Sequence, residues 1–150
     1  MALDFNIMVG GEAGQGVQSV GMILAKTLAY GDFRVFADQD YESRIRGGHN
    51  FFRIRAKDSD VLAASPELDI LVALNQETAD LHGNELKPAG VVIYDGEQGK
   101  SPLEGKQYIY IPLVKLAEDT VKNKLMANTV AAGAALGLIG YDFDLLPFIL

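Results

Sequence analysis

Residues 5–16 read Phe-Asn-Ile-Met-Val-Gly-Gly-Glu-Ala-Gly-Gln-Gly, a short apolar run followed at once by a glycine-rich loop. Behind the loop, mostly apolar side chains recur at helical spacing, and the pattern ends at Gly31. The repeated positions are Val17, Val20, Leu24, Thr27 and Leu28. This order predicts a strand, a glycine loop and a helix. Residues 33–37 predict a second strand, which makes the whole unit long enough for a βαβ crossover.

The rest of the chain continues the alternation of strands and helices. Residues 50–55 alternate in polarity, with Phe52 and Ile54 on one face, which predicts a strand with one solvated face. Continuous apolar runs at residues 69–75 and 90–95 are typical of strands that helices cover on both sides. No linker or repeat interrupts the pattern, so we predict one α/β domain over residues 1–150. Its expected architecture is a Rossmann-like three-layer fold, with a mostly parallel sheet and helices on both faces.

The remaining predicted elements are helices at residues 77–86, 113–125 and 129–139 and a strand at residues 107–111. The first helix is interrupted by Gly83 and closed by Pro88. The second should point an apolar face inward, formed by Leu113, Leu116, Ala117, Val121 and Leu125. The third has Asn128 as a good N-cap and Gly140 as its stop. Because it is rich in Ala and Gly, we expect another backbone to approach it closely.

Composition excludes several classes of protein. The chain has 150 residues, with 13 basic and 20 acidic side chains and a net charge of −7, which disfavours binding of nucleic acid or anionic membranes through overall charge. It has no cysteine, and therefore no disulfide, thiolate zinc site, iron–sulfur ligand or cysteine nucleophile. No signal-like start or membrane-length apolar run is visible, so a cytoplasmic protein is expected. The apolar residues near Leu150 favour a chain that continues into a further domain, although a partner covering this end would explain them too.

The glycine loop has a chemical interpretation. Glycines permit positive φ angles and let a ligand reach the backbone, while the first N–H groups of the following helix attract an anion, usually phosphate. Read from Gly11, the order is G-x-x-G-x-G, which differs from the ordinary dinucleotide fingerprint. Asp38, at the end of the second predicted strand, could hold a ribose hydroxyl. The alternative is a tight turn that binds nothing.

Residues 43–57 form a positive island in this acidic chain. Its cations are Arg44, Arg46, Arg53, Arg55 and Lys57, and it contains no acidic residue. For the last three we favour a solvated strand face whose cations pair with surplus acids. The first two precede Gly47-Gly48, which indicates unusual backbone or a close contact, and arginine pairs well with phosphate.

Other polar residues carry weaker signals. The two histidines, His49 and His82, lack partners at metal-ligand spacing, so we interpret them as structural hydrogen-bonding groups. Asp38, Asp40 and Glu42 are interpreted as a solvated loop rather than a carboxylate site. No Ser/His/Asp set is recognisable, and nothing indicates a self-sufficient catalyst.

Four segments together resemble a known family. They are Gly10-Gly-Glu-Ala-Gly-Gln-Gly-Val17, Tyr41-Glu-Ser-Arg-Ile-Arg-Gly-Gly-His-Asn50, Asp69-Ile-Leu-Val-Ala-Leu-Asn75 and Asn128-Thr-Val-Ala-Ala-Gly-Ala134. In this order they look like the gamma-type domain of the 2-oxoacid:ferredoxin oxidoreductases, from about Phe5 to Gly140. The version here looks most like the N-terminal domain of a fused alpha subunit of the 2-oxoglutarate type, because the loop lacks the Arg- and Gly-rich form usual in separate gamma subunits.

The resemblance implies a role in a divided enzyme. That enzyme decarboxylates a 2-oxoacid on thiamine diphosphate and Mg, passes electrons through iron–sulfur clusters to ferredoxin, and delivers the acyl group to coenzyme A. Without cysteine or a thiamine-diphosphate motif, this chain would leave those groups to the rest of the subunit or to a beta subunit, in a hetero-oligomer. A gamma-type domain would help to bind coenzyme A and cap the active site, with no catalytic residue of its own. The implied coenzyme A contacts in the glycine loop are Gly11, Glu12, Ala13, Gly14, Gln15 and Gly16. Further along the chain, the implied site residues are Tyr41, Ser43, Arg44 and Arg46, which would shape either the path of the pantetheine arm or the interface over the thiamine site.

Two other functions remain open on the sequence. One is a nicotinamide- or flavin-binding Rossmann domain of another oxidoreductase, supported by the strand, glycine loop, helix and Asp38. The other is a non-catalytic assembly domain, supported by the small-residue helix over residues 129–139. A shared active site between subunits would need assembly and binding together.

Overall fold

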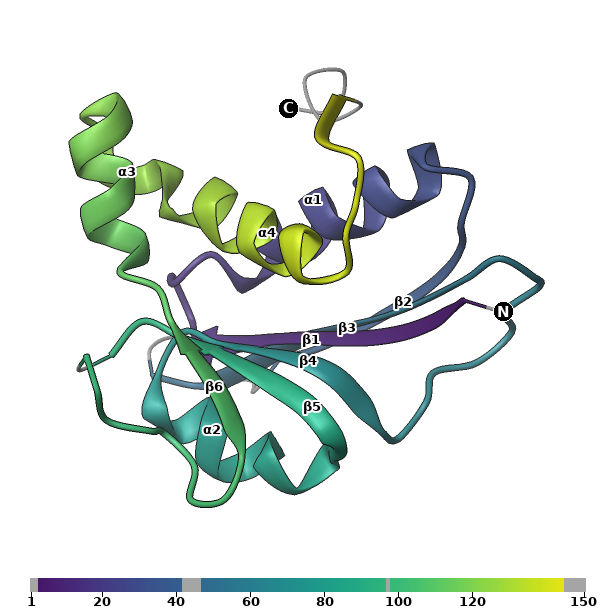
Figure 1. Ribbon diagram of the computed structural model, residues 1–150, viewed down its shortest axis with the longest axis horizontal. Helices are drawn as coiled ribbons and strands as arrows, with labels where there is room; N and C mark the ends of the chain where they lie inside the picture. Colours follow the sequence, from purple (N-terminus) through teal and green to yellow (C-terminus); the bar gives the residue numbers. More distant parts are fainter. Residues whose placement is uncertain (1–2, 42–46, 97, 145–150) are drawn as a thin grey trace.

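The computed structural model describes residues 3–41, 47–96 and 98–144. Within them, six strands form one sheet in the order β2-β3-β1-β4-β5-β6 (Figure 1). The strands are β1 (Asp4–Glu12), β2 (Arg34–Tyr41), β3 (His49–Lys57), β4 (Leu68–Ala73), β5 (Leu86–Tyr94) and β6 (Gln107–Tyr110). Strand β3 runs antiparallel to both of its neighbours, and the remaining strands share one direction. The predicted mostly parallel sheet is therefore confirmed.

Helices cover both faces of this sheet. They are α1 (Val17–Tyr30), α2 (Gln76–His82), α3 (Leu113–Val121) and α4 (Ala127–Leu138), with short 3-10 turns η1 (Gly83–Glu85) and η2 (Lys124–Met126). Figure 1 shows α1 and α4 on one face and α2 on the other, which gives the predicted three layers. In the described part of the chain, no helix is long and apolar enough to cross a membrane.

The core lies on both faces of the sheet, and β1 contributes to each. Ile7 and Val9 pack with α1 and α4, whereas Met8 belongs to the cluster under α2. On the α1 face, Phe52 packs against Gly21 so closely that a Cβ at Gly21 would collide with its ring. This contact holds the first turns of α1 against β3, and both elements line the pocket described below.

The predicted βαβ crossover from β1 through α1 to β2 differs from the structure in how its two strands pair. Strand β2 runs parallel to β1 but does not pair with it, because β3 returns antiparallel and lies between them. Asp38 and Asp40 lie in β2 and not in a loop, so the prediction of a loop is wrong, although both are solvated as expected. Among the described strands, β2 is at the edge of the sheet. Glu42 lies outside the described residues.

The helix boundaries also differ from expectation. Helix α3 ends at Val121, because Lys122 adopts a left-handed conformation (φ 57°) at its C-cap. The predicted inward face is therefore only partly correct: Leu113 and Ala117 are buried, whereas Leu116, Val121 and Leu125 are exposed.

Helix α4 starts two residues earlier than predicted. Met126 is its N-cap, so Asn128 lies inside the first turn. The expected close approach holds for one face, where Ala131 and Ala135 are buried in the core shared with α1, but a Cβ at Gly133 would meet open space among the described residues.

Helix α2 is shorter than predicted. It ends at His82, a 3-10 turn follows, and the chain enters β5 at Leu86. Pro88 therefore lies in a strand and does not close the helix.

Candidate functional site

The glycine loop leaves the sheet later than its sequence indicates. Strand β1 continues through Gly11 to Glu12, and Gly11 is buried under Leu74 and the Gln15 side chain. Of the loop glycines, only Gly14 (φ 93°) and Gly16 (φ 84°) adopt the left-handed conformation that favours glycine. The exposed turn is thus confined to a few residues before α1.

Two sets of hydrogen bonds hold this loop. The Gln15 carboxamide donates to Leu74 O (3.2 Å) and accepts from Glu12 N (2.6 Å). In addition, Ala13 N donates to Gly48 O (3.1 Å), which ties the loop to the residue before β3. Gln15 therefore serves the shape of the loop, and its polar atoms are already bonded to backbone.

The N-terminus of α1 has no side-chain cap. Gly16 is the N-cap residue and cannot supply one, and the first helical bond runs from Val20 N to Gly16 O (3.0 Å). The N–H groups of the first helical turn precede that bond, so they have no partner inside the helix. They lie at the positive end of the helix dipole, where an anion is stabilised.

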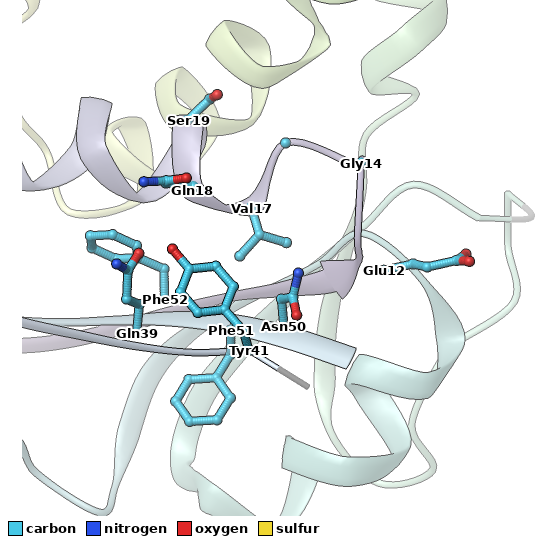
Figure 2. A pocket seen from close by; sticks show the side chains of 11 residues that line it. Glu12, Gly14, Val17, Gln18, Ser19, Gln39, Tyr41, Asn50, Phe51 and Phe52 are labelled. Carbon is cyan, nitrogen blue, oxygen red and sulfur yellow. The ribbon is translucent and has the colours of Figure 1, made fainter. Parts of the chain in front are cut away.

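A cavity of about 250 Å³ opens beside this helix terminus. It is lined by Glu12, Gly14, Gly16, Val17, Gln18, Ser19, Gln39, Tyr41, Asn50, Phe51 and Phe52. Figure 2 shows Tyr41 and Asn50 between the sheet and the start of α1, with the Glu12 side chain directed away from them. Of the residues predicted from the sequence, the structure brings together Gly14, Gly16 and Tyr41 here, with Glu12 at the margin. Gly11, Ala13 and Gln15 are not among the lining residues.

Several polar residues of this pocket were not anticipated. Gln18, Ser19, Gln39 and Asn50 all line it. Asn50 Oδ1 is buried and has no hydrogen-bond partner among the described residues, which is costly unless a ligand or water satisfies it. Strand alternation could have found this residue, because Asn50 shares a face with Phe52.

Asn128, which the sequence predicted as a helix N-cap, lies against the loop instead. Its carboxamide occupies the space beside Gly16, where a Cβ would collide with it. Helix α4 therefore supports the loop from the side opposite β3.

The positive island is largely neutralised where the structure describes it. Arg53 pairs with Glu85 (2.7 Å), and Arg55 forms two hydrogen bonds to the Asp4 carboxylate (2.8 and 3.0 Å). The hydrogen bond from Arg55 lowers the pKa of Asp4, against a smaller effect of burial. The predicted pairing of these two arginines with surplus acids is confirmed, but their side chains are partly buried and do not lie on a fully solvated face. Ser43, Arg44 and Arg46 lie outside the described residues.

The two histidines are brought together although 33 residues separate them in the chain. His49 Nε2 and His82 Nε2 are 2.9 Å apart, and His82 Nδ1 bonds Glu85 Oε1 (2.5 Å). Their interpretation as hydrogen-bonding groups is confirmed. Among the residues that the structure describes, there is no group of three or more metal-ligating side chains.

These features define an α/β domain with a polar pocket at the carboxyl end of β1, beside an uncapped helix N-terminus. The family model described as pyruvate ferredoxin/flavodoxin oxidoreductase matches residues 6–148. The chain therefore belongs to this family, and its resemblance to the gamma-type domain of the 2-oxoacid:ferredoxin oxidoreductases is confirmed.

Individual relatives come in two sizes. A 2-oxoacid:ferredoxin oxidoreductase alpha subunit from Aeropyrum pernix is 24% identical over 89% of this chain, which spans only 21% of that relative. The 2-oxoglutarate synthase subunit KorC from Methanocaldococcus jannaschii is 29% identical over 85% of this chain and 71% of its own length. The chain thus spans about a fifth of its alpha-subunit relatives and most of a KorC subunit.

Solved structures have the same fold. A 2-oxoglutarate:ferredoxin oxidoreductase from Magnetococcus marinus, with 2-oxoglutarate, coenzyme A and succinyl-CoA bound, matches 97% of this chain and 26% of its own, at 26% identity and a TM-score of 0.84. A keto/oxoacid ferredoxin oxidoreductase gamma subunit from Geobacter sulfurreducens matches 95% of this chain and 82% of its own, at 28% identity and a TM-score of 0.78.

Proposed function

We propose that this gamma-type domain binds the phosphates of coenzyme A in the pocket at the start of α1, as the acyl-acceptor side of a 2-oxoacid:ferredoxin oxidoreductase. The observation that carries the proposal is the uncapped N-terminus of α1, facing a cavity behind two left-handed glycines. The coenzyme A bound to the similar Magnetococcus marinus enzyme supports the choice of ligand.

The chemistry of the pocket suits an anion with polar surroundings. A phosphate beside Gly14 and Gly16 would accept from the N–H groups that precede the first helical bond of α1. No Cβ stands between it and the backbone at either glycine. Gln18, Gln39 and Asn50 add side-chain amides for further hydrogen bonds. At about 250 Å³ the cavity accommodates one end of coenzyme A, and the remainder of the molecule would extend beyond it.

The described lining contains no basic side chain. The proposal therefore assigns the neutralising charge to Arg44 and Arg46, with Ser43 beside them, because Arg53 and Arg55 are already paired with carboxylates. An arginine matches phosphate in a bidentate manner.

The wider reaction belongs to other parts of the enzyme. Because the chain has no cysteine, it ligates no iron–sulfur cluster, and the proposal places the cluster, thiamine diphosphate and Mg in a beta subunit or in a continuation of this subunit. The complete enzyme, in the cytoplasm, would oxidatively decarboxylate a 2-oxoacid, reduce ferredoxin and form acyl-CoA. In this proposal residues 1–150 are the N-terminal part of a longer alpha-type subunit.

A glycine substitution in the assembled enzyme tests the assignment of coenzyme A. Gly14→Asp places a carboxylate at the proposed phosphate site, and a Cβ at Gly14 meets no atom within 4 Å. We expect the KM for coenzyme A to rise roughly 10- to 100-fold, since a hydrogen bond to a charged group contributes about 1.5–3 kcal/mol. Coenzyme A-independent decarboxylation should persist.

Gly105→Asp is the matched control. Gly105 also has a positive φ (71°) and open space around its Cβ position, but it lies outside the pocket lining. The proposal fails if coenzyme A saturates the Gly14→Asp and Gly105→Asp enzymes equally.

Assembly is a second function that a specific observation favours. Leu116, Val121 and Leu125 leave an apolar surface exposed along α3 and η2, with Leu125 81% exposed. A buried role in a complex would explain these side chains. Leu125→Lys should weaken association with the beta subunit in size-exclusion chromatography, while coenzyme A binding to the separated domain stays unchanged.

A further inference from the structure

A chain of four polar side chains lies on the α2 face of the sheet, with its two histidines buried and Arg53 and Glu85 partly exposed. Arg53 donates to Glu85 Oε2 (2.7 Å), Glu85 Oε1 bonds His82 Nδ1 (2.5 Å), and His82 Nε2 lies 2.9 Å from His49 Nε2. Both histidines are more than nine-tenths buried. None of the four belongs to a contact that the proposed binding of coenzyme A requires.

The partners fix where the protons lie. Arg53 holds Glu85 as an acceptor, so His82 donates from Nδ1. The Nε2–Nε2 contact then holds one proton, which in the neutral pair is donated by His49 Nε2 to His82 Nε2. Two protons on this axis would face each other at 2.9 Å and break the contact.

Ring packing reinforces the pair. The His82 ring meets Phe51 edge-on at 5.2 Å and lies 5.0 Å from the His49 ring. In the described part of the chain, the charged groups on the surrounding elements are Glu12, which is the cross-strand partner of His49 on β1, Arg53 on β3, Glu85 on η1, and the solvated Glu77 and Asp80 on α2.

The pair is joined to the loop through the backbone around His49, which itself pairs with Glu12 of β1. His49 begins β3, and the carbonyl of Gly48 before it accepts from Ala13 N in the loop (3.1 Å). Asn50, the residue after His49, lines the pocket on the opposite face. A contact that fixes His49 to α2 therefore fixes both neighbours of His49, one under the loop and one in the pocket.

We propose that the hydrogen bond between His49 and His82 positions the glycine loop and Asn50 without touching the ligand. The pair is a brace between β3 and α2, and Glu85 with Arg53 sets its proton arrangement. The positioning of the loop is inferred from the His49–His82 and Ala13–Gly48 hydrogen bonds, whereas the effect on coenzyme A binding rests on the proposed function.

Two substitutions at one site separate the hydrogen bond from simple packing. The polar end of glutamine falls near the Nε2 position of histidine, whereas that of asparagine falls near Nδ1. His82→Gln can therefore still bond His49, but His82→Asn can reach only Glu85. Both variants lose the ring, so packing losses are shared between them.

The measurement is amide hydrogen exchange of the peptide that contains Ala13, together with the KM for coenzyme A, in the assembled enzyme. We expect His82→Asn to speed exchange and raise KM roughly 3- to 10-fold with kcat unchanged, and His82→Gln to stay within about twofold of wild type, since the retained bond contributes roughly 1 kcal/mol. Equal exchange at Ala13 in the two variants, whether fast or slow, overturns the proposal.

The reciprocal pair His49→Gln and His49→Asn gives the same contrast if the first pair assembles poorly. Glutamine at residue 49 can donate to His82 Nε2, and asparagine cannot reach it. Exchange at Ala13 that follows the predicted contrast supports the brace even if coenzyme A binding is unaffected. An unchanged KM for coenzyme A, together with altered exchange at Ala13, would instead contradict the proposed function.

Discussion

The two ends of β1 use polar groups in opposite ways. At its carboxyl end, the left-handed Gly14 and Gly16 lead into a helix terminus that no side chain caps. At its amino end, the Asp4 carboxylate takes two hydrogen bonds from Arg55, and Asn6 N donates to Asp69 (2.8 Å), which also holds Lys87. One end has backbone donors available for a ligand, and the other has its charges neutralised within the fold.

The difference follows from the direction of the chain. Parallel strands bring their carboxyl ends to the edge where the following helices begin, so helix dipoles and free N–H groups gather there. Strand β3 runs the other way and carries cations along its length. Arg53 and Arg55 are thereby placed away from the pocket opening, where they stabilise the sheet. Six substitutions, controls included, test this contrast.

Gly16→Ala should have the largest effect. The residue has a φ of 84°, and a Cβ would collide with the Asn128 carboxamide. Backbone strain of about 1–2 kcal/mol should lower the Tm by roughly 2–8 °C, and displacement of Asn128 should add to it. Gly14→Ala is the control, because it has the same backbone strain in open space. Equal losses of Tm in thermal denaturation would show that Asn128 does not support the loop.

Asn50→Ala should weaken coenzyme A binding with little loss of stability. Its Oδ1 is buried beside the pocket without a partner in the described residues, so the side chain is available to a ligand. Removing one hydrogen bond should raise Kd by roughly tenfold in isothermal titration calorimetry.

Asp38→Ala serves as the comparison for Asn50. Asp38 is exposed on β2 and does not line the pocket, so coenzyme A affinity should not change. The same variant also tests the alternative that this domain binds a nicotinamide cofactor. Measurable NAD(H) binding that disappears in Asp38→Ala would favour that alternative over coenzyme A.

Asp4→Asn should destabilise the protein modestly and in a pH-dependent way. Because Arg55 lowers the pKa of Asp4, the folded state binds this proton less readily than the unfolded state. The stabilisation is therefore present above the ordinary aspartate range near pH 4 and is lost as the pH falls through the lowered value. Urea denaturation at pH 7 and about pH 3 should show the gap between wild type and variant closing in acid. A gap of constant size would mean that the ion pair does not contribute.

Asp60→Asn should have the smallest effect. Asp60 lies 3.9 Å from Arg34 near the same edge of the sheet, and both side chains are solvated, so the pair is screened by water. No shift in the urea midpoint is expected. A loss as large as that of Asp4→Asn would show that exposure does not separate the two ion pairs.

Local sequence patterns predicted much of this molecule. The strand, glycine loop and helix of residues 5–31 appear as expected, because glycine conformation and helical spacing are local properties. The position of β3 between β1 and β2 was not predicted, since strand order depends on long-range pairing. The extent of α3 was also misjudged, because Leu125 fits the helical period although the helix ends at Val121.

The candidate site shows the same limit. Gly14, Gly16 and Tyr41 were identified from the sequence and meet at one pocket. Asn50 was accessible from strand alternation but was not singled out. The contact of His49 with His82 could not be predicted, because it depends on how α2 packs against β3 across 33 residues of chain.

Hydrogen exchange with and without coenzyme A tests the central claim most directly. In the assembled enzyme, saturating coenzyme A should slow exchange in a peptide covering residues 13–19, because phosphate oxygens would accept from the N–H groups at the start of α1. A peptide covering residues 55–69, at the amino end of the sheet, should exchange equally fast in both conditions. Unchanged exchange over residues 13–19 under saturation would contradict the assignment of this pocket to coenzyme A.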